Sequence, residues 1–320
     1  MKAGPQRQPV VIRNADVLVE TSVFGVAATS RALYERLARL AHRLTARPEY
    51  GKLWVPSITL DEMAATPVPR RADVLGVLLN LYRELGDRIV LTGELEQIVA
   101  GEWATPPRFA SVPIGQLEED LVACVRGSGA GTKIDAMGRE FAAWRRERRA
   151  EHDKFLMELE KKYAADPKAR QAISLALDKA RQPTELYEFC DDIAAQLIRE
   201  FAGKDPVEGL KLAKAEPERY LATWTYSLLL RVAQFAQTIP PRERSTSPFG
   251  AYAKLLKSHE NDIIDATLAA VGAVCGLLIT QDGGLRERLN FLHGRHVSRI
   301  QAFEFSEVEA YWIEPGVAAG

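Results

Sequence analysis

Two acidic side chains stand directly after apolar runs of this chain. Glu20 follows the run at 16–19, and Asp282 follows the run at 277–281. Ligands bind outside the carboxyl ends of the strands in an open parallel sheet, so acids at two strand ends form a candidate site. Taken singly, each acid is better explained as a cap of the turn or helix that follows its strand.

A third acid, Asp265, lies within an apolar helical pattern. Its neighbours one position before and three and four positions after are Ile, Leu and Ala, so it lies on or beside a stripe that must be buried. An ionised carboxylate there is costly unless a cation or metal pairs with it. An ion pair with Arg286 or Arg288 is one alternative. We expect instead that Asp265 is buried close to Asp282 and has no arginine partner.

Glu62 and Asp262 complete the candidate cluster. Glu62 lies in a short helix, where the adjacent Asp61 is a competing candidate, and Asp262 is equally well explained as an acid at a helix start. Acids that converge without a His or Cys cluster favour hard cations such as Mg²⁺ or Mn²⁺. The five histidines lack any zinc-ligand spacing, and the three cysteines lie far apart. The expected site is therefore a carboxylate site for magnesium or manganese.

Alternating strands and helices must position these acids. Strands are expected at 15–19, 53–56, 88–91, 276–280 and 297–300. Between them, the stretch 134–237 shows four helical patterns separated by Pro or Gly and no strand alternation. The predicted fold class is α/β with a central, mostly parallel sheet, interrupted by an all-α insertion. The first half of the α/β domain is 14–92, the insertion is 93–248, and the second half is 249–314.

Composition excludes several classes of protein. The 320 residues are 47% hydrophobic and 27% charged, which is typical of a globular protein. Because the net charge is −1, any nucleic-acid site must be a local basic patch rather than a generally basic surface. No segment resembles a signal peptide, and the apolar stretch 263–279 is too short beyond its Asp to span a bilayer. With dispersed, odd-numbered cysteines, we expect a cytoplasmic protein without a membrane partner.

The order of these motifs resembles the PIN-domain nuclease family. The resemblance rests on the strand that ends in Glu20-Thr21-Ser22, on Glu62, on the motif at 261–266 before an Ala-rich helix, and on the strand that ends at 278–282. The spacing from Asp265 to Asp282 is its most specific part. It covers about 15–91 and 250–311, whereas the helical block has no counterpart in the family. Glu20 stands where the family usually has Asp.

The resemblance implies a PIN-like three-layer fold and a metal-dependent endoribonuclease that hydrolyses RNA with Mg²⁺ or Mn²⁺. The implied catalytic residues are Glu20, Glu62, Asp262, Asp265 and Asp282. Three of them, Glu20, Asp265 and Asp282, are the implied metal ligands. The residues expected to orient these carboxylates through hydrogen bonds are Thr21, Ser22, Asn261 and Thr280.

Substrate phosphates require cations. The candidate substrate-binding residues are Arg145, Arg146, Arg148 and Arg149 on the insertion, with Arg286 and Arg288 beside Asp282. A solvated helix face interleaved with acids is an equal alternative for the first four. RNA is the expected partner ahead of DNA.

Two other functions stay open. The chain is alternatively a catalytically weak or inactive PIN-like scaffold, in which the helical insertion binds a protein partner, nucleic acid or a second copy of the chain. It is also compatible with a structure-specific DNA nuclease that uses the same acids. Metal binding distinguishes the ribonuclease from the scaffold, and substrate preference distinguishes it from the DNA nuclease.

Overall fold

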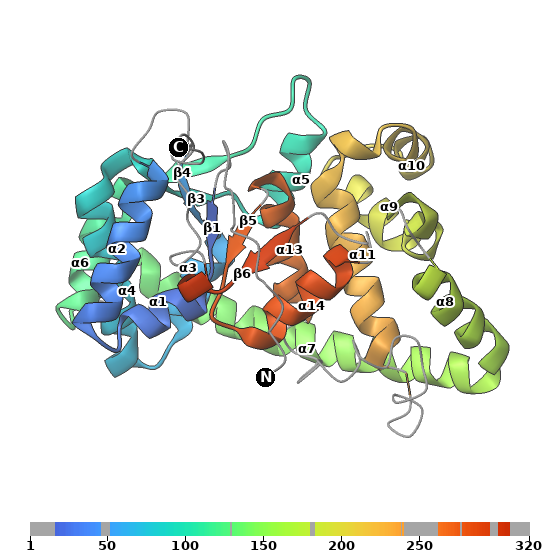
Figure 1. Ribbon diagram of the computed structural model, residues 1–320, viewed down its shortest axis with the longest axis horizontal. Helices are drawn as coiled ribbons and strands as arrows, with labels where there is room; N and C mark the ends of the chain where they lie inside the picture. Colours follow the sequence, from blue (N-terminus) through green and yellow to red (C-terminus); the bar gives the residue numbers. More distant parts are fainter. Residues whose placement is uncertain are drawn as a thin grey trace, which may run out of the picture.

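The computed structural model of the chain describes residues 17–45, 52–128, 130–179, 183–237, 239, 262–275, 277–294 and 300–307. In this part of the chain, a central sheet lies between a layer of helices on one face and a larger helical assembly on the other (Figure 1). The architecture is therefore α/β, as the alternation of strands and helices predicts.

The sheet has six strands in the order β4-β3-β2-β1-β5-β6. Their bounds are β1 Val17–Val19, β2 Leu53–Val55, β3 Ile89–Thr92, β4 Ser111–Pro113, β5 Leu277–Ile279 and β6 Gln301–Phe303. Neighbouring strands are parallel except β3 and β4, which are antiparallel. The mostly parallel sheet confirms the predicted fold class at this level of detail.

The central pair β1 and β5 positions the candidate site. Val19 is in register with Ile279, and the Glu20 N–H donates to the Ile279 carbonyl at 3.2 Å. Because the two strands are parallel, their carboxyl ends meet at the same edge of the sheet. The residues that follow them, Glu20 and Thr280, are therefore neighbours although they are far apart in sequence.

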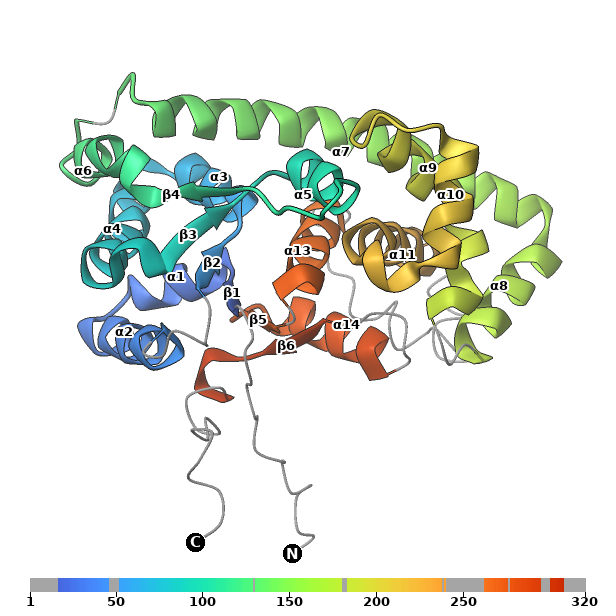
Figure 2. The ribbon, with the colours of Figure 1, turned by 90° about the horizontal axis from the view of Figure 1, so that it is seen from above.

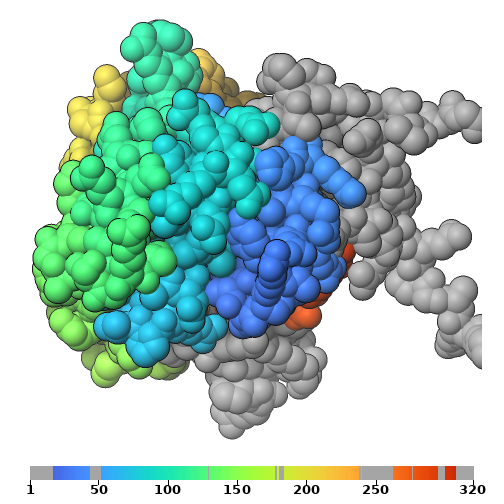
Figure 3. Space-filling model, turned by 90° about the vertical axis from the view of Figure 1, so that its left-hand side faces the viewer, coloured from blue at the N-terminus to red at the C-terminus, as the bar shows by residue number. Residues whose placement is uncertain are grey.

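Alternate residues of each strand face two different cores, as the period of two in a strand requires. Val17 and Val19 belong to one core, whereas Leu18 and Leu278 belong to the other. The helices of the first core are α1 (Thr21–Ala27), α2 (Arg31–Thr45), α4 (Val68–Leu85) and α6 (Glu118–Val125). Figure 3 looks onto the outer surface of this layer.

The opposite face of the sheet carries the elements nearest the candidate site. These elements are α3 (Ser57–Ala65), α5 (Leu95–Glu102), α13 (Asp262–Cys275) and α14 (Gly283–Gly294). Short 3₁₀ helices, η2 (Gly86–Arg88) and η3 (Ile114–Leu117), flank β3 and β4 in the chain. The helix α3 contributes to both cores, since Ile58 belongs to one and Met63 to the other.

The region between α6 and α13 consists, in its described residues, of helices joined by turns. Its elements are α7 (Lys133–Ala165), α8 (Pro167–Lys179), η4 (Pro183–Phe189), α9 (Asp191–Glu200), α10 (Pro206–Ala215), η5 (Pro217–Arg219) and α11 (Leu221–Gln237). This confirms the prediction that 134–237 forms helices rather than a second sheet. None of the described helices is both long and apolar enough to cross a membrane.

The long helix α7 connects the two parts of the molecule. It runs along the α/β layers and continues over the helical block (Figure 2). A Cβ atom at Gly138 would lie 2.5 Å from the Ala64 carbonyl oxygen, so glycine is what allows α7 to approach α3 this closely. This close crossing brings the basic segment of α7 near the candidate site.

The helical block does not have a separate core. Helix α11 packs on α13, and its residues Trp224 and Phe235 join the same apolar cluster as Leu18 of β1. Within this cluster, Trp224 stacks on Tyr187 with 3.8 Å between ring centroids. The block therefore extends the second core of the α/β domain instead of forming a detached unit.

Three features differ from the sequence-based expectations. Strand β4 lies within 93–248, the range assigned to the helical insertion, but it pairs with β3 in the sheet. A three-residue edge strand in a segment rich in Pro and Gly carries no periodic signal. The last strand is at 301–303 rather than 297–300, of which 297–299 lie outside the described residues. Helix α10 was not predicted.

Candidate active site

Glu20 begins the site at the junction of β1 and α1, where it caps the helix. Its Oε1 accepts a hydrogen bond from the Ser22 amide at 3.0 Å. Its Oε2 accepts from the Ser22 hydroxyl and, at 2.8 Å, from the Thr280 hydroxyl. Burial raises the pKa of Glu20, and these hydrogen bonds oppose that rise. Both oxygens are thus held in place by donors.

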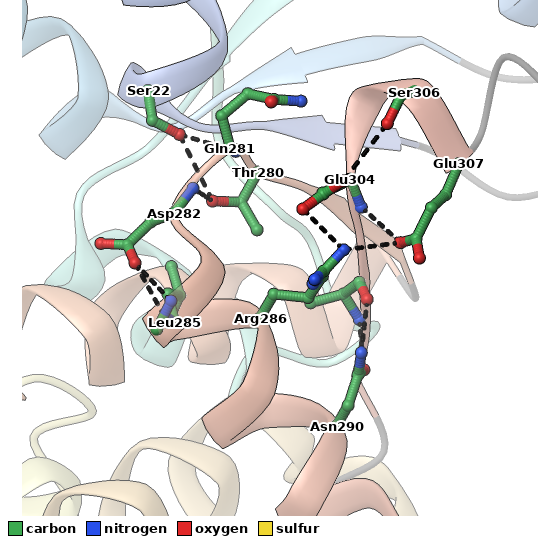
Figure 4. A network of polar contacts seen from close by, with 12 residues as sticks. Ser22, Thr280, Gln281, Asp282, Leu285, Arg286, Asn290, Glu304, Ser306 and Glu307 are labelled. Atoms are coloured by element: carbon green, nitrogen blue, oxygen red, sulfur yellow. Dashed lines mark hydrogen bonds and ion pairs between the residues drawn. The ribbon is translucent and has the colours of Figure 1, made fainter. Parts of the chain in front are cut away.

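Asp282 performs the same role after β5, at the start of α14. Its Oδ1 accepts from the amides of Gly284 and Leu285 at 2.7 and 3.0 Å. The Asp282 amide in turn donates to the Thr280 hydroxyl at 2.9 Å, so Thr280 links both strand-end acids. Figure 4 shows this turn, with the second carboxylate oxygen of Asp282 directed away from the helix. That oxygen has no partner among the described residues.

Glu62 reaches the same place from α3. Its Oε2 accepts a hydrogen bond from the Thr21 hydroxyl at 2.6 Å. The pKa of Glu62 is raised to about 7, mainly by burial and also by the charges of Glu20 and Asp282, while the Thr21 hydrogen bond and Arg145 oppose the rise. The structure therefore brings Glu20, Glu62 and Asp282 within electrostatic reach of one another, with Arg145 beside them.

The residues expected to orient the carboxylates do make such contacts where they are described. Thr21 donates to Glu62, and Ser22 and Thr280 donate to Glu20. Ser22 also accepts from the Gln281 amide at 2.8 Å, which ties the ends of β1 and β5 together. The fourth expected residue, Asn261, lies outside the described residues.

Asp265 differs from the expectation in one respect. It is buried, and its charge environment includes Asp282 and Glu20, but Arg288 donates to its Oδ2 from α14. The prediction that Asp265 lacks an arginine partner is therefore wrong. Arg288 is itself 6% exposed, so each buried charge compensates the other. Burial raises the pKa of Asp265 to about 8, although the Arg288 guanidinium acts in the opposite direction.

Asp262 is directed toward the helical block. It accepts a hydrogen bond from Gln237 on α11, and its Oδ2 lies 3.6 Å from Nε2 of His152 on α7. All three side chains are buried. The structure thus places Asp262 in a contact between α13 and the insertion, away from the hydrogen-bonded acids at the strand ends.

The six candidate arginines occupy different environments. Arg286 pairs with Glu304 and Glu307 at 2.9 and 3.0 Å (Figure 4), while Arg288 pairs with Asp265. The four arginines of α7 differ in their exposure and their partners. Arg145 is half-buried, and its charge lowers the pKa of Glu62. Arg148 pairs with Glu151 at 2.7 Å, while Arg146 and Arg149 are exposed. Arg145 is the arginine of this segment that the fold brings to the acids.

Three buried polar residues of the surrounding helices were missed by sequence reasoning. His152 and Gln237 contact Asp262, and Glu102 caps α11 by accepting from the amides of Ala222 and Thr223 at 2.6 and 3.0 Å. Glu102 interrupts an apolar helical pattern, which is a signal that could have identified it as a buried acid. His152 and Gln237 have no such signal, because their contacts join helices far apart in sequence.

The described residues contain no group of three or more His, Cys, Asp or Glu side chains arranged to hold one metal ion. The acids at the strand ends are instead linked through hydroxyl groups and helix amides. Comparisons with protein-family models, with curated proteins and with solved structures each found no match. Functional inference therefore depends on the geometry and chemistry of this chain's own residues.

Proposed function

We propose that this protein is a metal-dependent endoribonuclease whose active site lies at the carboxyl ends of β1 and β5. The observation that carries the proposal is the convergence of Glu20, Glu62 and Asp282 from three different elements, with Arg145 beside them. A crowded group of carboxylates is unfavourable unless a cation or protons neutralise it. The position of the group, outside the ends of parallel strands, is where α/β sheets bind ligands.

The chemistry of the donor set fits Mg²⁺ or Mn²⁺, because every candidate ligand is a carboxylate oxygen. Within the described residues, Oε1 of Glu62 and Oδ2 of Asp282 accept no hydrogen bond, whereas both oxygens of Glu20 do. Glu62 and Asp282 are therefore the residues that would hold the ion, with Glu20 adjoining them. A divalent cation supplies Lewis-acid activation of the scissile phosphate and of the attacking water.

The protein's own groups would perform the remaining steps. Without a cation, burial and the neighbouring acids raise the pKa of Glu62 to about 7, so a bound cation would stabilise its ionised form. Arg145 supplies a positive charge where a substrate phosphate approaches Glu62. Asp265 is buried, pairs with Arg288 and acts on Glu20 and Asp282 through its charge. In this scheme Asp265 is a positioning residue rather than a metal ligand.

The proposal is tested by incubating the full chain with single-stranded RNA and, in parallel, single-stranded DNA, with Mg²⁺, Mn²⁺ or EDTA. The wild type should cleave RNA with either cation, and Asp282→Asn and Glu62→Gln should lose the activity. Glu158→Gln, an exposed change elsewhere on α7, is the matched control and should cleave normally. Cleavage of DNA alone would identify the chain as a DNA nuclease instead.

A second candidate function, a non-catalytic scaffold, is favoured by one specific observation. Glu20 and Asp282 both cap helices, and Asp265 pairs with Arg288, so each acid has a structural role without a metal. In that case the helical insertion would bind a protein or nucleic-acid partner. Calorimetric titration with Mn²⁺ distinguishes the two functions, since a scaffold of this kind would show no heat of binding that depends on Asp282.

A further inference from the structure

A large cavity lies between the α/β domain and the helical block, and its lining includes Asp61, the neighbour of Glu62 in the chain. Its volume is about 640 Å³, and its walls come from α3, α5, α7, α9, α11 and α13. Figure 2 shows α7 passing over α3, α5, α9 and α11 in this part of the molecule. Cavities of this size hold small organic ligands.

One part of the lining is aromatic. The rings come from both sides of the cavity: Phe141, Trp144 and Phe155 on α7, Phe201 after α9, and Tyr226 on α11. Phe141 and Trp144 stack on each other with 5.5 Å between their ring centroids. Trp and Tyr faces attract cations as well as apolar groups.

The charged part of the lining is strongly acidic. Asp61 is within electrostatic reach of Glu94 and Glu140, and Glu96 adjoins Glu94. Among the residues that the structure describes, no cation pairs with Asp61. The cavity therefore has an excess of negative charge at α3, α5 and the neighbouring turn of α7.

The arginines that line the cavity do not offset this charge. Arg148 pairs with Glu151 at 2.7 Å, and Arg231 pairs with Asp192 at 2.6 Å. Each arginine thus neutralises an acid of its own. A phosphate or carboxylate ligand would meet net repulsion here, which separates this cavity from any nucleic-acid site.

A second, independent observation points to a ligand that donates hydrogen bonds. Gln234 of α11 lines the cavity and is only 7% exposed. Its Oε1 is enclosed and accepts no hydrogen bond from the described residues. A buried polar group without a partner costs free energy unless a ligand or water satisfies it.

We propose that this cavity binds a small organic cation, with one or two ammonium or guanidinium groups on an alkyl or aryl body. The acids around Asp61 supply the opposite charge, the rings around Trp144 contact the body of the ligand, and Gln234 accepts one of its N–H groups. The site is distinct from the proposed nuclease site. Helix α3 nevertheless belongs to both, because Asp61 faces the cavity and the adjacent Glu62 faces the strand ends.

The test is binding to the full chain by calorimetry, with tryptophan fluorescence as a second signal because Trp144 lines the cavity. The probes are spermidine, agmatine and phenethylamine, with 2-phenylethanol as the neutral analogue of the last and tetra-arginine as a basic peptide. At least one amine should bind, and phenethylamine should bind at least about 10-fold more tightly than 2-phenylethanol. Equal binding of this pair, binding of the peptide alone, or no amine binding at millimolar concentration would overturn the proposal.

Variants locate the binding site. Asp61→Asn should weaken amine binding by about 10-fold or more, Glu140→Gln by a smaller factor, and Trp144→Phe should remove the fluorescence change. Glu140 is exposed, so Glu140→Gln keeps the test decisive if Asp61→Asn does not fold. Glu158→Gln removes the same charge from α7 outside the cavity and should leave binding unchanged. If it weakens binding as much as Glu140→Gln does, the attraction is non-specific and the site is refuted.

Discussion

Two neighbouring acids on α3, Asp61 and Glu62, lie in two regions that differ in whether hydrogen-bond donors stabilise the carboxylates. Burial raises the pKa of each carboxyl to about 7. Glu62 lies in the strand-end cluster of Glu20, Glu62 and Asp282, where hydroxyl groups and helix amides donate to the carboxylates. Asp61 lies in the cavity, where no described residue donates to its carboxylate.

This difference indicates what each region is prepared to bind. Donors that hold the strand-end carboxylates fix the direction of their remaining lone pairs, which is the arrangement that a metal ion with strict geometry needs. Acids without such donors keep their rotamer freedom and can adapt to a larger, flexible cation. In the proposed functions, the strand-end cluster is therefore organised before the ion binds, whereas Asp61 in the cavity depends on a ligand for a partner.

The largest expected effect concerns the strand-end cluster. Glu62→Gln keeps the side chain's size and its ability to accept from Thr21, but it removes the charge of one of the two proposed ligands of the ion. The rate of RNA hydrolysis should fall by about two to three orders of magnitude, the range seen when one electrostatic stabiliser of the transition state is lost. Initial rates on a labelled RNA, with Glu158→Gln as control, measure this. Activity within about threefold of the wild type would remove Glu62 from the mechanism.

The next largest effect concerns the buried pair behind the cluster. Arg288→Met leaves the Asp265 carboxyl buried without its cation, so the free energy of unfolding should fall by about 3 kcal/mol. Denaturant unfolding at pH 9 measures this, since Asp265, whose pKa is about 8, is then mostly ionised in the wild type. The double variant Arg288→Met with Asp265→Leu should recover part of the loss. An unchanged midpoint in the single variant would show that the pair contributes nothing to stability.

A smaller effect is the pH dependence of stability in metal-free buffer. A carboxyl group whose pKa is raised on folding stabilises the folded state fully below its unfolded pKa, near 4, and this contribution is lost as pH rises to the folded value. For Asp61 and Glu62 the loss should occur between about pH 4 and pH 7. Above pH 7, Asp61→Asn and Glu62→Gln should each be more stable than the wild type, by about 1–3 kcal/mol.

Manganese then separates the two regions. At pH 8, Mn²⁺ should raise the melting temperature of the wild type and of Asp61→Asn, because the strand-end cluster is intact in both. It should have little effect on Glu62→Gln. The same rise in all three proteins would mean that the ion binds elsewhere, and the proposed organisation of the strand-end cluster for metal would be wrong.

The smallest predicted effect concerns Arg145. Its guanidinium lowers the pKa of Glu62, and in the proposed mechanism it attracts the substrate phosphate. Arg145→Ala should raise the KM for RNA about 5- to 10-fold and shift the acidic limb of the pH–rate profile toward higher pH. Lys161→Ala, an exposed change farther along α7, should alter neither quantity. A KM change of equal size in both variants would show that Arg145 attracts RNA only through the overall charge of α7 and has no specific contact with the substrate.

Much of this arrangement could be predicted because it depends on local patterns. Apolar runs that end in an acid identify β1 with Glu20 and β5 with Asp282, and a parallel sheet brings such ends to one edge. Periodicity of 3.6 residues likewise identifies four helical segments of 134–237, although it missed α10. Each of these patterns is contained within a few residues, so it can be recognised without knowing how the rest of the chain folds.

Other features could not be predicted because they depend on how helices pack. Arg288 was one of two possible partners of Asp265, and the path of α14 against α13 decided the pairing. Arg145 differs from Arg146 only by a rotation of about 100° around α7, and the crossing at Gly138 determines which of them faces Glu62. The three-residue strand β4 similarly depends on β3 for its existence.

The sequence by itself thus determined the alternation of strands and helices, the all-helical block, and the placement of Glu20 and Asp282 at strand ends. Tertiary structure alone decided that Asp262 faces His152 and Gln237, that Asp265 pairs with Arg288, and that an acidic, aromatic cavity lies beside α3. The physical reason is the separation along the chain of the residues that interact. Periodicity is set by neighbours along the chain, whereas charge pairing and cavities are set by side chains that meet only after packing has fixed the distance and angle between distant helices.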